Sequence, residues 1–212
     1  MPPLPALTAE CLRNPAADRQ APYGERRSAI LGAPALAQAE RELTGWQGYA
    51  ATPLHPLPAL AQALGVAAVH YKDEGSRFGL GSFKALGGAY AVARLLCREL
   101  GARLGRELST QDLLTPELRA LCAGITVTCA TDGNHGRSVA WGAQLFGCRC
   151  VIYIHATVSE GRKAAIAHYG AEVVRTPGNY DDAVRQADAD AKLHGRFVIS
   201  DTSYPGYMDV PR

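Results

Sequence analysis

The chain has 212 residues, of which 47% are hydrophobic and 20% are charged, with a formal net charge of +2 at pH 7. This balance is typical of a globular protein, and the length allows one or two domains with a sizeable core. The 22 basic and 20 acidic residues form no lysine-arginine cluster, so nucleic acid is not expected as a partner. Charged residues interrupt every apolar run, so no membrane-spanning segment is expected.

The N-terminus and the cysteines indicate a cytoplasmic protein. Residues 1–12 contain prolines and an acidic residue but no basic stretch, so they do not form a secretory signal. The cysteines are scattered and form no CxxC pair, which favours reduced, buried thiols over disulfides or zinc ligands. No metal site is expected, and the six cysteines are Cys11, Cys97, Cys122, Cys129, Cys148 and Cys150.

From about Gly65 onward, short β-rich runs alternate with longer helical patterns, which predicts a parallel α/β sheet. The first strand is expected at 68–73, followed by a helix over 82–100 with Ser82 as its N-cap. Further strands are expected at 125–130, 151–155, 172–175 and 197–200. Helices are expected at 117–123, 135–146, 159–169 and 181–194, and residues 101–116 form an inserted connection. The first fifty residues are expected to form an arm.

Residues 79–88 read Gly-Leu-Gly-Ser-Phe-Lys-Ala-Leu-Gly-Gly, after a strand and at the start of a helix. The positive end of the helix dipole opposes a charge on Lys84, which favours a neutral nucleophilic amine able to attack an aldehyde. Gly87 and Gly88 cost helix stability, so a flat ring or a neighbouring helix must lie close to them. The alternative, a solvated lysine with glycines used for packing, is commoner for such a pattern. Neither the Walker phosphate-binding motif nor the dinucleotide-binding motif GxGxxG matches this segment.

A second group of polar residues, Thr131-Asp-Gly-Asn-His-Gly136, follows a strand that is buried on both faces. Ligands bind at this end of the strands in open α/β sheets, and loop N–H groups with the Asn134 amide are suited to a carboxylate or phenolate oxygen. Taken alone, Asp-Gly-Asn is a common turn, and His135 is more often a helix-start residue with a satisfied ring than a catalyst. Asp201, at another strand end, is equally suited to the same cleft or to an N-cap.

Two segments together, Lys72–Tyr90 and Ala130–Trp141, resemble the fold-type II pyridoxal-phosphate (PLP) enzymes, the group of tryptophan synthase β, threonine dehydratase and threonine synthase. The Ser-Phe-Lys and Gly-Asn-His-Gly elements carry this resemblance. Asp132, where dehydratases usually have serine, is more similar to the diaminopropionate ammonia-lyases. The same holds for Arg77-Phe-Gly-Leu, for Arg137 to Trp141 and for Ser200-Asp-Thr.

The resemblance implies PLP as cofactor and a small amino acid, 2,3-diaminopropionate, as substrate. Lys84 is then the Schiff-base lysine and a proton shuttle, and Asn134 contacts the PLP ring hydroxyl. The loop of Thr131, Asp132, Gly133 and Asn134 holds the substrate carboxylate. Asp132 and Asp201 accept the α-proton from opposite enantiomers, and elimination yields ammonia and an enamine that hydrolyses to pyruvate and a second ammonia.

The resemblance also implies a domain division. Residues 1–87 belong to a large PLP-binding domain, 88–195 form a small α/β domain, and 196–212 begin the return into the large domain. The glycine-rich phosphate loop and a residue facing the pyridine nitrogen fall after Arg212, so the sequence is expected to be a truncated N-terminal half with its large domain incomplete. The full-length form is expected to be a homodimer of amino-acid catabolism. A serine/threonine dehydratase-like lyase and a non-catalytic remnant remain as alternatives.

Overall fold

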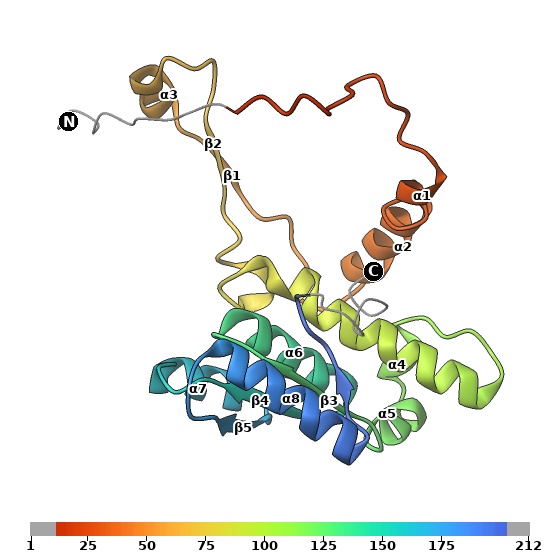
Figure 1. The fold of residues 1–212 in the computed structure, drawn as a ribbon. Coiled ribbons are helices and arrows are strands. Elements are labelled where there is room, and N and C mark those ends of the chain that lie inside the picture. Colours follow the sequence, from red (N-terminus) through yellow and green to blue (C-terminus); the bar gives the residue numbers. More distant parts are fainter. Residues whose placement is uncertain (1–11, 203–212) are drawn as a thin grey trace. The chain divides into compact units, whose positions relative to one another are not determined.

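The computed structural model describes residues 12–202, in which four parallel strands form the central sheet (Figure 1). The strand order is β5-β4-β3-β6, with Val127 of β3 opposite Phe197 of β6. The chain moves outward from β3 through β4 to β5 and then returns to place β6 beside β3. The pair β3/β6 is therefore the point where the strand order reverses. The strands are β3 (Thr126–Ala130), β4 (Arg149–Ile154), β5 (Glu172–Arg175) and β6 (Phe197–Val198).

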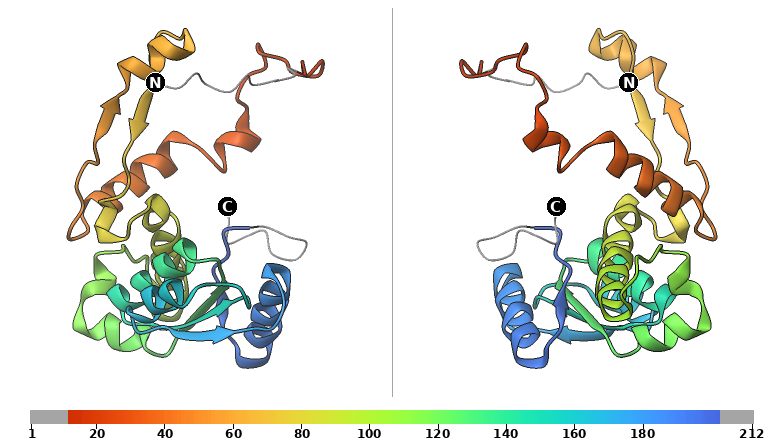
Figure 2. Two further views of the ribbon diagram at one scale, coloured as in Figure 1. Left: turned by 90° about the vertical axis from the view of Figure 1, so that its left-hand side faces the viewer. Right: turned by 90° about the vertical axis from the view of Figure 1, so that its right-hand side faces the viewer.

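Helices cover both faces of this sheet (Figure 2). Ile152 and Ile154 of β4 belong to a large core with helices α4 and α6, whereas Val151 and Tyr153 pack with α8 on the other face. Burial on both faces explains why these strands are almost continuously apolar. The helices are α4 (Gly88–Leu104), α5 (Pro116–Cys122), α6 (Asn134–Phe146), α7 (Glu160–Ala167) and α8 (Tyr180–His194), with a 3-10 turn η3 (Asp112–Leu114) before α5.

The chain separates into two compact units, Met1–Leu36 and Ala37–Arg212. The first contains α1 (Glu25–Ser28) and the start of α2 (Ala33–Thr44). Within it, the Tyr23 hydroxyl donates a hydrogen bond to the Leu31 carbonyl at 3.0 Å. The predicted arm and the predicted domain division at 87/88 and 195/196 remain predictions, and residues 203–212 of the last segment lie outside the described residues.

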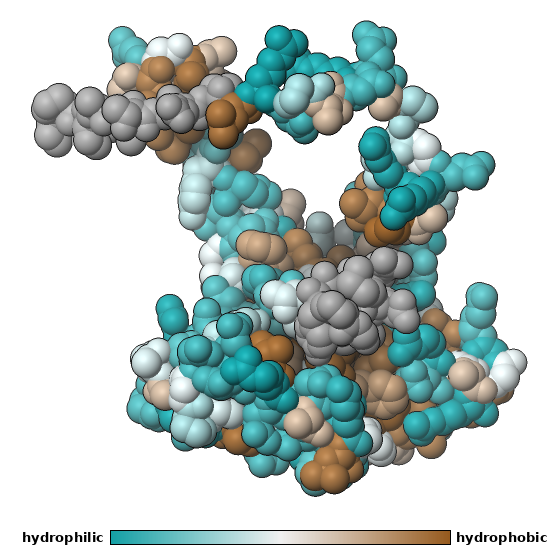
Figure 3. Space-filling model, in the orientation of Figure 1, coloured by the Kyte–Doolittle hydropathy of each residue, from teal (hydrophilic) through white to brown (hydrophobic). Residues whose placement is uncertain are grey.

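The strand expected at 68–73 does not join the parallel sheet. It forms β2 (His70–Lys72), which pairs antiparallel with β1 (Leu54–Pro56). Helix α3 (Pro58–Leu64) lies in the connection between the two strands. All residues of β1 and β2 are exposed, and Figure 3 shows apolar side chains around α3. The prediction missed β1 because this strand has only three residues and contains a proline, which weakens the strand signal.

A buried arginine fixes the base of this hairpin to the turn that precedes Lys84. The Arg77 side chain is 6% exposed and donates to Glu74 at 2.8 and 3.0 Å, to Thr52 at 3.1 Å and to the Ala50 carbonyl at 2.8 Å. The hydrogen bond from Arg77 lowers the pKa of Glu74 to about 2. The guanidinium and the carboxylate thus stay charged together, which anchors η1 (Arg77–Gly79).

The helix predicted over 82–100 begins later and ends later. Residues Phe83–Leu86 form a separate 3-10 turn, η2, and α4 runs over Gly88–Leu104. Ser82 is extended and makes no side-chain cap, so its predicted capping role is wrong. The Gly87-Gly88 pair has low helix propensity and separates the two elements. A Cβ at Gly88 would lie 2.5 Å from Ser138 Oγ of α6, so a neighbouring helix explains this small residue.

Burial of the cysteines is confirmed for most of those that the structure describes. Burial raises the pKa of Cys97 to about 12 and that of Cys129 well above its ordinary value, so these thiols are poor nucleophiles. Cys148 is half-buried, and Cys11 lies outside the described residues. Within 12–202 there is no cluster of three metal-ligating side chains, and no helix is long and apolar enough to cross a membrane.

We expect Gly142→Ala to destabilise the fold by about 1–3 kcal/mol, because overpacking outweighs the helix propensity that alanine gains. A Cβ at this position of α6 would lie 2.8 Å from the Ala89 Cα and 3.0 Å from its Cβ. The matched control is Gly161→Ala in α7, where nothing lies within 4 Å and a gain of up to about 1 kcal/mol is expected. Urea unfolding measures both, and an undisturbed Gly142→Ala protein would contradict the close approach of α4 and α6.

Candidate functional site

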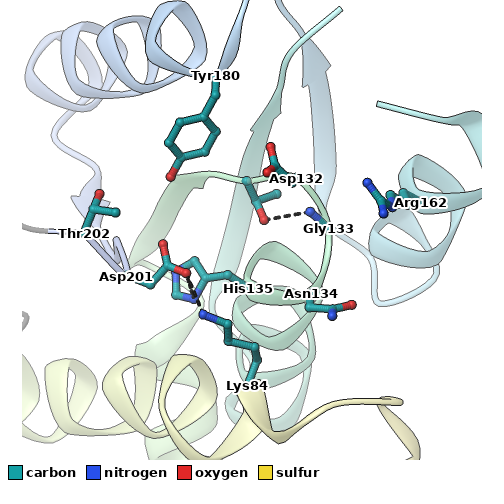
Figure 4. A pocket seen from close by; sticks show the side chains of 10 residues that line it. Lys84, Asp132, Gly133, Asn134, His135, Arg162, Tyr180, Asp201 and Thr202 are labelled. Atoms are coloured by element: carbon teal, nitrogen blue, oxygen red, sulfur yellow. Dashed lines mark hydrogen bonds and ion pairs between the residues drawn. The ribbon is translucent and has the colours of Figure 1, made fainter. Parts of the chain in front are cut away.

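A pocket of about 480 Å³ opens at the carboxyl ends of β3 and β6, where the strand order reverses (Figure 4). Its volume lies within the range of small-molecule sites, and its position is the one at which open α/β sheets bind ligands. The residues that line it are Lys84, Thr131, Asp132, Gly133, Asn134, His135, Arg162, Tyr180, Asp201 and Thr202.

The central contact of the pocket joins Lys84 to Asp201, which are 117 residues apart. The Lys84 Nζ donates to Asp201 Oδ2 at 2.9 Å, and each side chain is about one-third exposed. Burial raises the pKa of Asp201, but the hydrogen bond from Lys84 and nearby positive charge outweigh burial and hold this pKa below its usual range. Asp201 therefore faces the cleft as a carboxylate. Of the two roles expected for it, a residue of the cleft or an N-cap, the structure places it in the cleft.

The lysine turn is held by its backbone. The Ser138 hydroxyl of α6 donates to the Lys84 carbonyl at 2.8 Å and accepts from the Ala89 N–H at 3.0 Å. One buried hydroxyl thus ties η2 and the start of α4 to α6. Because Lys84 is in η2 and not in the first turn of α4, the dipole argument for a neutral amine does not apply in the form expected.

The loop after β3 forms the wall opposite Lys84. The Thr131 hydroxyl accepts from the N–H groups of Gly133 and Gly136, both at 3.0 Å. Gly133 has φ 155° and ψ −77°, a conformation that side chains disfavour, and a Cβ at Gly136 would lie 2.4 Å from the Thr131 side chain. The two glycines are therefore required for the tight turn that brings Asn134, the first residue of α6, to the pocket.

The second expected carboxylate, Asp132, lines the same pocket in a different environment. Its side chain is 67% exposed, and its Oδ1 lies 2.9 Å from His155 Nε2. His155 follows β4 directly, so adjacent parallel strands deliver the two residues to one edge. The sequence alone did not point to His155, because the pairing of β3 with β4 was needed to place it.

Three further side chains line the pocket without having been identified as site residues. Tyr180 begins α8, and in Figure 4 its hydroxyl points toward Asp201; burial raises its pKa. Arg162 of α7 lies across Gly133, with its Cδ 3.4 Å from the position of a Cβ there. Thr202 follows Asp201. Arg162 and Tyr180 lie in the first turns of helices that start at the same edge of the sheet. Their position directly after a predicted strand could have indicated them from the sequence.

His135 matches the structural role expected for it. Its side chain is only 7% exposed, and its Nε2 lies 2.7 Å from the Ile199 carbonyl. Its Nδ1 lies 3.9 Å from Asp201 Oδ2. Burial lowers the pKa of His135, so the ring is largely neutral near pH 7 and links α6 to the end of β6.

Comparison with known proteins gives consistent results. The family model described as pyridoxal-phosphate dependent enzyme matches residues 45–210. Diaminopropionate ammonia-lyase of Salmonella typhimurium is 45% identical over 163 residues, which cover 77% of this chain and 40% of that protein. A protein of Acidovorax sp. named probable D-serine dehydratase is 31% identical, covering 75% of this chain and 37% of its own length.

Among solved structures, Escherichia coli diaminopropionate ammonia lyase in complex with an aminoacrylate-PLP azomethine reaction intermediate aligns with a TM-score of 0.71 at 41% identity. The alignment covers 82% of this chain and 43% of that one. The chain thus spans about two fifths of the length of the curated relative from Salmonella typhimurium.

Proposed function

The chain belongs to the pyridoxal-phosphate dependent enzymes. From that premise we propose that it functions as the N-terminal part of a carbon–nitrogen lyase whose substrate is 2,3-diaminopropionate. The observation that carries the proposal is the 2.9 Å contact between Lys84 and Asp201, in one pocket with Asp132. The 45% identity to a diaminopropionate ammonia-lyase supports this substrate. The products would be pyruvate and ammonia.

The residues of the pocket fit PLP as the cofactor. A primary amine, Lys84, is available for the cofactor aldehyde, and Asn134 stands at the wall where it would contact the ring hydroxyl. The Gly133 turn leaves the wall without a side chain at that position. When bound, PLP supplies an electron sink that makes the α-proton of an amino acid acidic.

The side chains of the pocket would then divide the work of elimination. Asp201, kept ionised by Lys84, accepts the α-proton from one side of the substrate, and Asp132 accepts it from the other for the opposite enantiomer. The electrons of the broken C–H bond form the new C=C bond while the bond from the β-carbon to nitrogen breaks. Lys84 delivers the proton with which the β-amino group leaves as ammonia. The Thr131–Asn134 loop would hold the substrate carboxylate.

A dehydratase that removes a β-hydroxyl group is the second candidate, because a relative named as a D-serine dehydratase is 31% identical. The same proton acceptors would serve that reaction. The higher identity to the ammonia-lyase and the carboxylate at position 132 favour an amine as the leaving group.

The purified chain, supplied with PLP, tests the proposal when it is given 2,3-diaminopropionate or serine in parallel. We expect a visible absorption band from bound cofactor and faster release of ammonia and pyruvate from diaminopropionate. Faster turnover of serine would favour the dehydratase. A folded chain that attaches PLP to no lysine and releases no ammonia from either amino acid would contradict the proposal and favour the non-catalytic alternative.

The proposal extends to the domains and the assembly. Residues 88–195 would be the small domain, since α4 to α8 and strands β3 to β5 fall within this range. Residues 1–87 and 196–212 would belong to the large domain. The homodimer and the catabolic role are part of the same proposal and rest on the likeness to the ammonia-lyases. The cytoplasmic location is also part of it and rests on the N-terminal composition and the scattered cysteines.

A further inference from the structure

The imidazole of His155 contacts Asp132, the more exposed of the two proposed bases. His155 Nε2 is 2.9 Å from Asp132 Oδ1, and the side chains are 18% and 67% exposed, respectively. An exposed aspartate on a turn ordinarily samples several rotamers. A fixed partner at hydrogen-bond distance removes this freedom for Asp132.

His155 is itself held on a rigid turn. The Nη1 of Arg175, at the end of β5, donates to the carbonyls of His155 at 3.2 Å, Ala156 at 2.9 Å and Val158 at 2.7 Å. The Nη2 of the same guanidinium donates to Glu160 at 2.6 Å. Three carbonyls bound to one arginine fix the path of the turn, so the imidazole has a defined position.

The contacts of the ring also define its tautomer. An ionised Asp132 can only accept, so Nε2 must carry the proton that it donates. In the neutral imidazole Nδ1 is then an acceptor, and the Thr157 hydroxyl lies 3.0 Å from it and donates. The charged groups around this pair are Asp132 on the β3–α6 turn, Arg175, Glu160 and Arg162, which lies across Gly133.

We propose that His155 is a positioning residue, which holds Asp132 Oδ1 through Nε2–H while Thr157 sets the tautomer, so that Oδ2 accepts the substrate proton. This inference rests on the proposed function, because it assigns Asp132 the role of a base. It deepens that function by adding a residue that touches neither substrate nor cofactor. Misplacement of a reacting group by about 1 Å costs on the order of 100-fold in rate, which sets the scale of the expected effect.

Long-range ¹⁵N–¹H NMR of the imidazoles tests the tautomer on the chain without cofactor. In alkaline buffer we expect His155, assigned by its loss in His155→Gln, to be protonated on Nε2 alone. Thr157→Val should allow the tautomer protonated on Nδ1 to become populated. Asp132→Asn should shift the His155 resonances more than those of His168, the control that follows α7. Protonation of His155 on Nδ1 in the unchanged chain would overturn the proposal.

Kinetics with the PLP-loaded protein supplies the second test. His155→Leu should lower kcat for the enantiomer that depends on Asp132 by about 10- to 100-fold and leave the other enantiomer nearly unchanged. His155→Gln keeps an N–H donor and should restore most of this activity, whereas a merely structural role would affect both enantiomers alike. His168→Gln is the matched control.

Asp132→Asn distinguishes an error in the positioning role of His155 from an error in the proposed role of Asp132 as a base. If Asp132→Asn is selective for one enantiomer but His155→Leu is not, the positioning role is wrong and the proposed function stands. If Asp132→Asn itself lacks selectivity, the assignment of Asp132 as a base fails first.

Discussion

Lys84→Ala is expected to abolish the borohydride-reducible attachment of PLP and to lower ammonia release by at least about 1000-fold, since no other described residue that lines the pocket has a primary amine. The measurement is borohydride reduction followed by mass spectrometry of the peptides, together with an ammonia assay. A reducible adduct that persists on another lysine of the Lys84→Ala protein would show that the assignment is wrong.

Two further variants distinguish chemistry from charge. Lys84→Arg keeps a cation beside Asp201 but has no amine that can condense with an aldehyde, so we expect it to lose activity as fully as Lys84→Ala. Burial raises the pKa of Asp201 and the Lys84 hydrogen bond is the main influence that lowers it, so Lys84→Ala should also raise this pKa. Lys192→Ala, on α8 beside Asp188, is the neutral control and should keep the adduct.

The parallel sheet could be predicted from the sequence because each of its strands is a short run of apolar and β-branched residues between helical patterns. The strand at Glu172–Arg175 matches its predicted bounds, and the fold-type II architecture is confirmed by the family match over residues 45–210. The region around Lys84 could not be predicted in the same way. There a glycine pair breaks the helix, and a three-residue strand pairs with a segment expected in another sheet.

The expected site residues all line one pocket, although they come from distant parts of the chain. Lys84, Asn134 and Asp201 meet there because β6 inserts beside β3, and a strand order of this kind cannot be read from local patterns. The same order explains what sequence reasoning missed. Tyr180 and His155 reach the site through the packing of α8 and β4 and carry no motif of their own.

The environments of Asp132 and Asp201 predict opposite enantiomer preferences. Asp201 pairs with Lys84 at 2.9 Å, whereas Asp132 comes from the β3–α6 turn and is held by His155. An amino acid bound between them presents its α-proton to one carboxylate or the other, according to its configuration. We therefore expect Asp132→Asn to lower turnover of one enantiomer of 2,3-diaminopropionate by about 100- to 10,000-fold, with a much smaller effect on the other, and Asp201→Asn to show the reverse.

Separate assays with the D- and L-substrates measure the crossover, and Asp181→Asn in the exposed first turn of α8 is the control. The Asp201→Asn variant also removes the ion pair of Lys84, so a modest loss for both enantiomers is expected on top of the selective one. Asparagine keeps the size of the side chain and some of its hydrogen bonds but cannot accept the α-proton, so the selective loss reports the base. Equal losses for both enantiomers in both variants would instead favour Lys84 as the proton acceptor, since its amine lines the same pocket as both carboxylates.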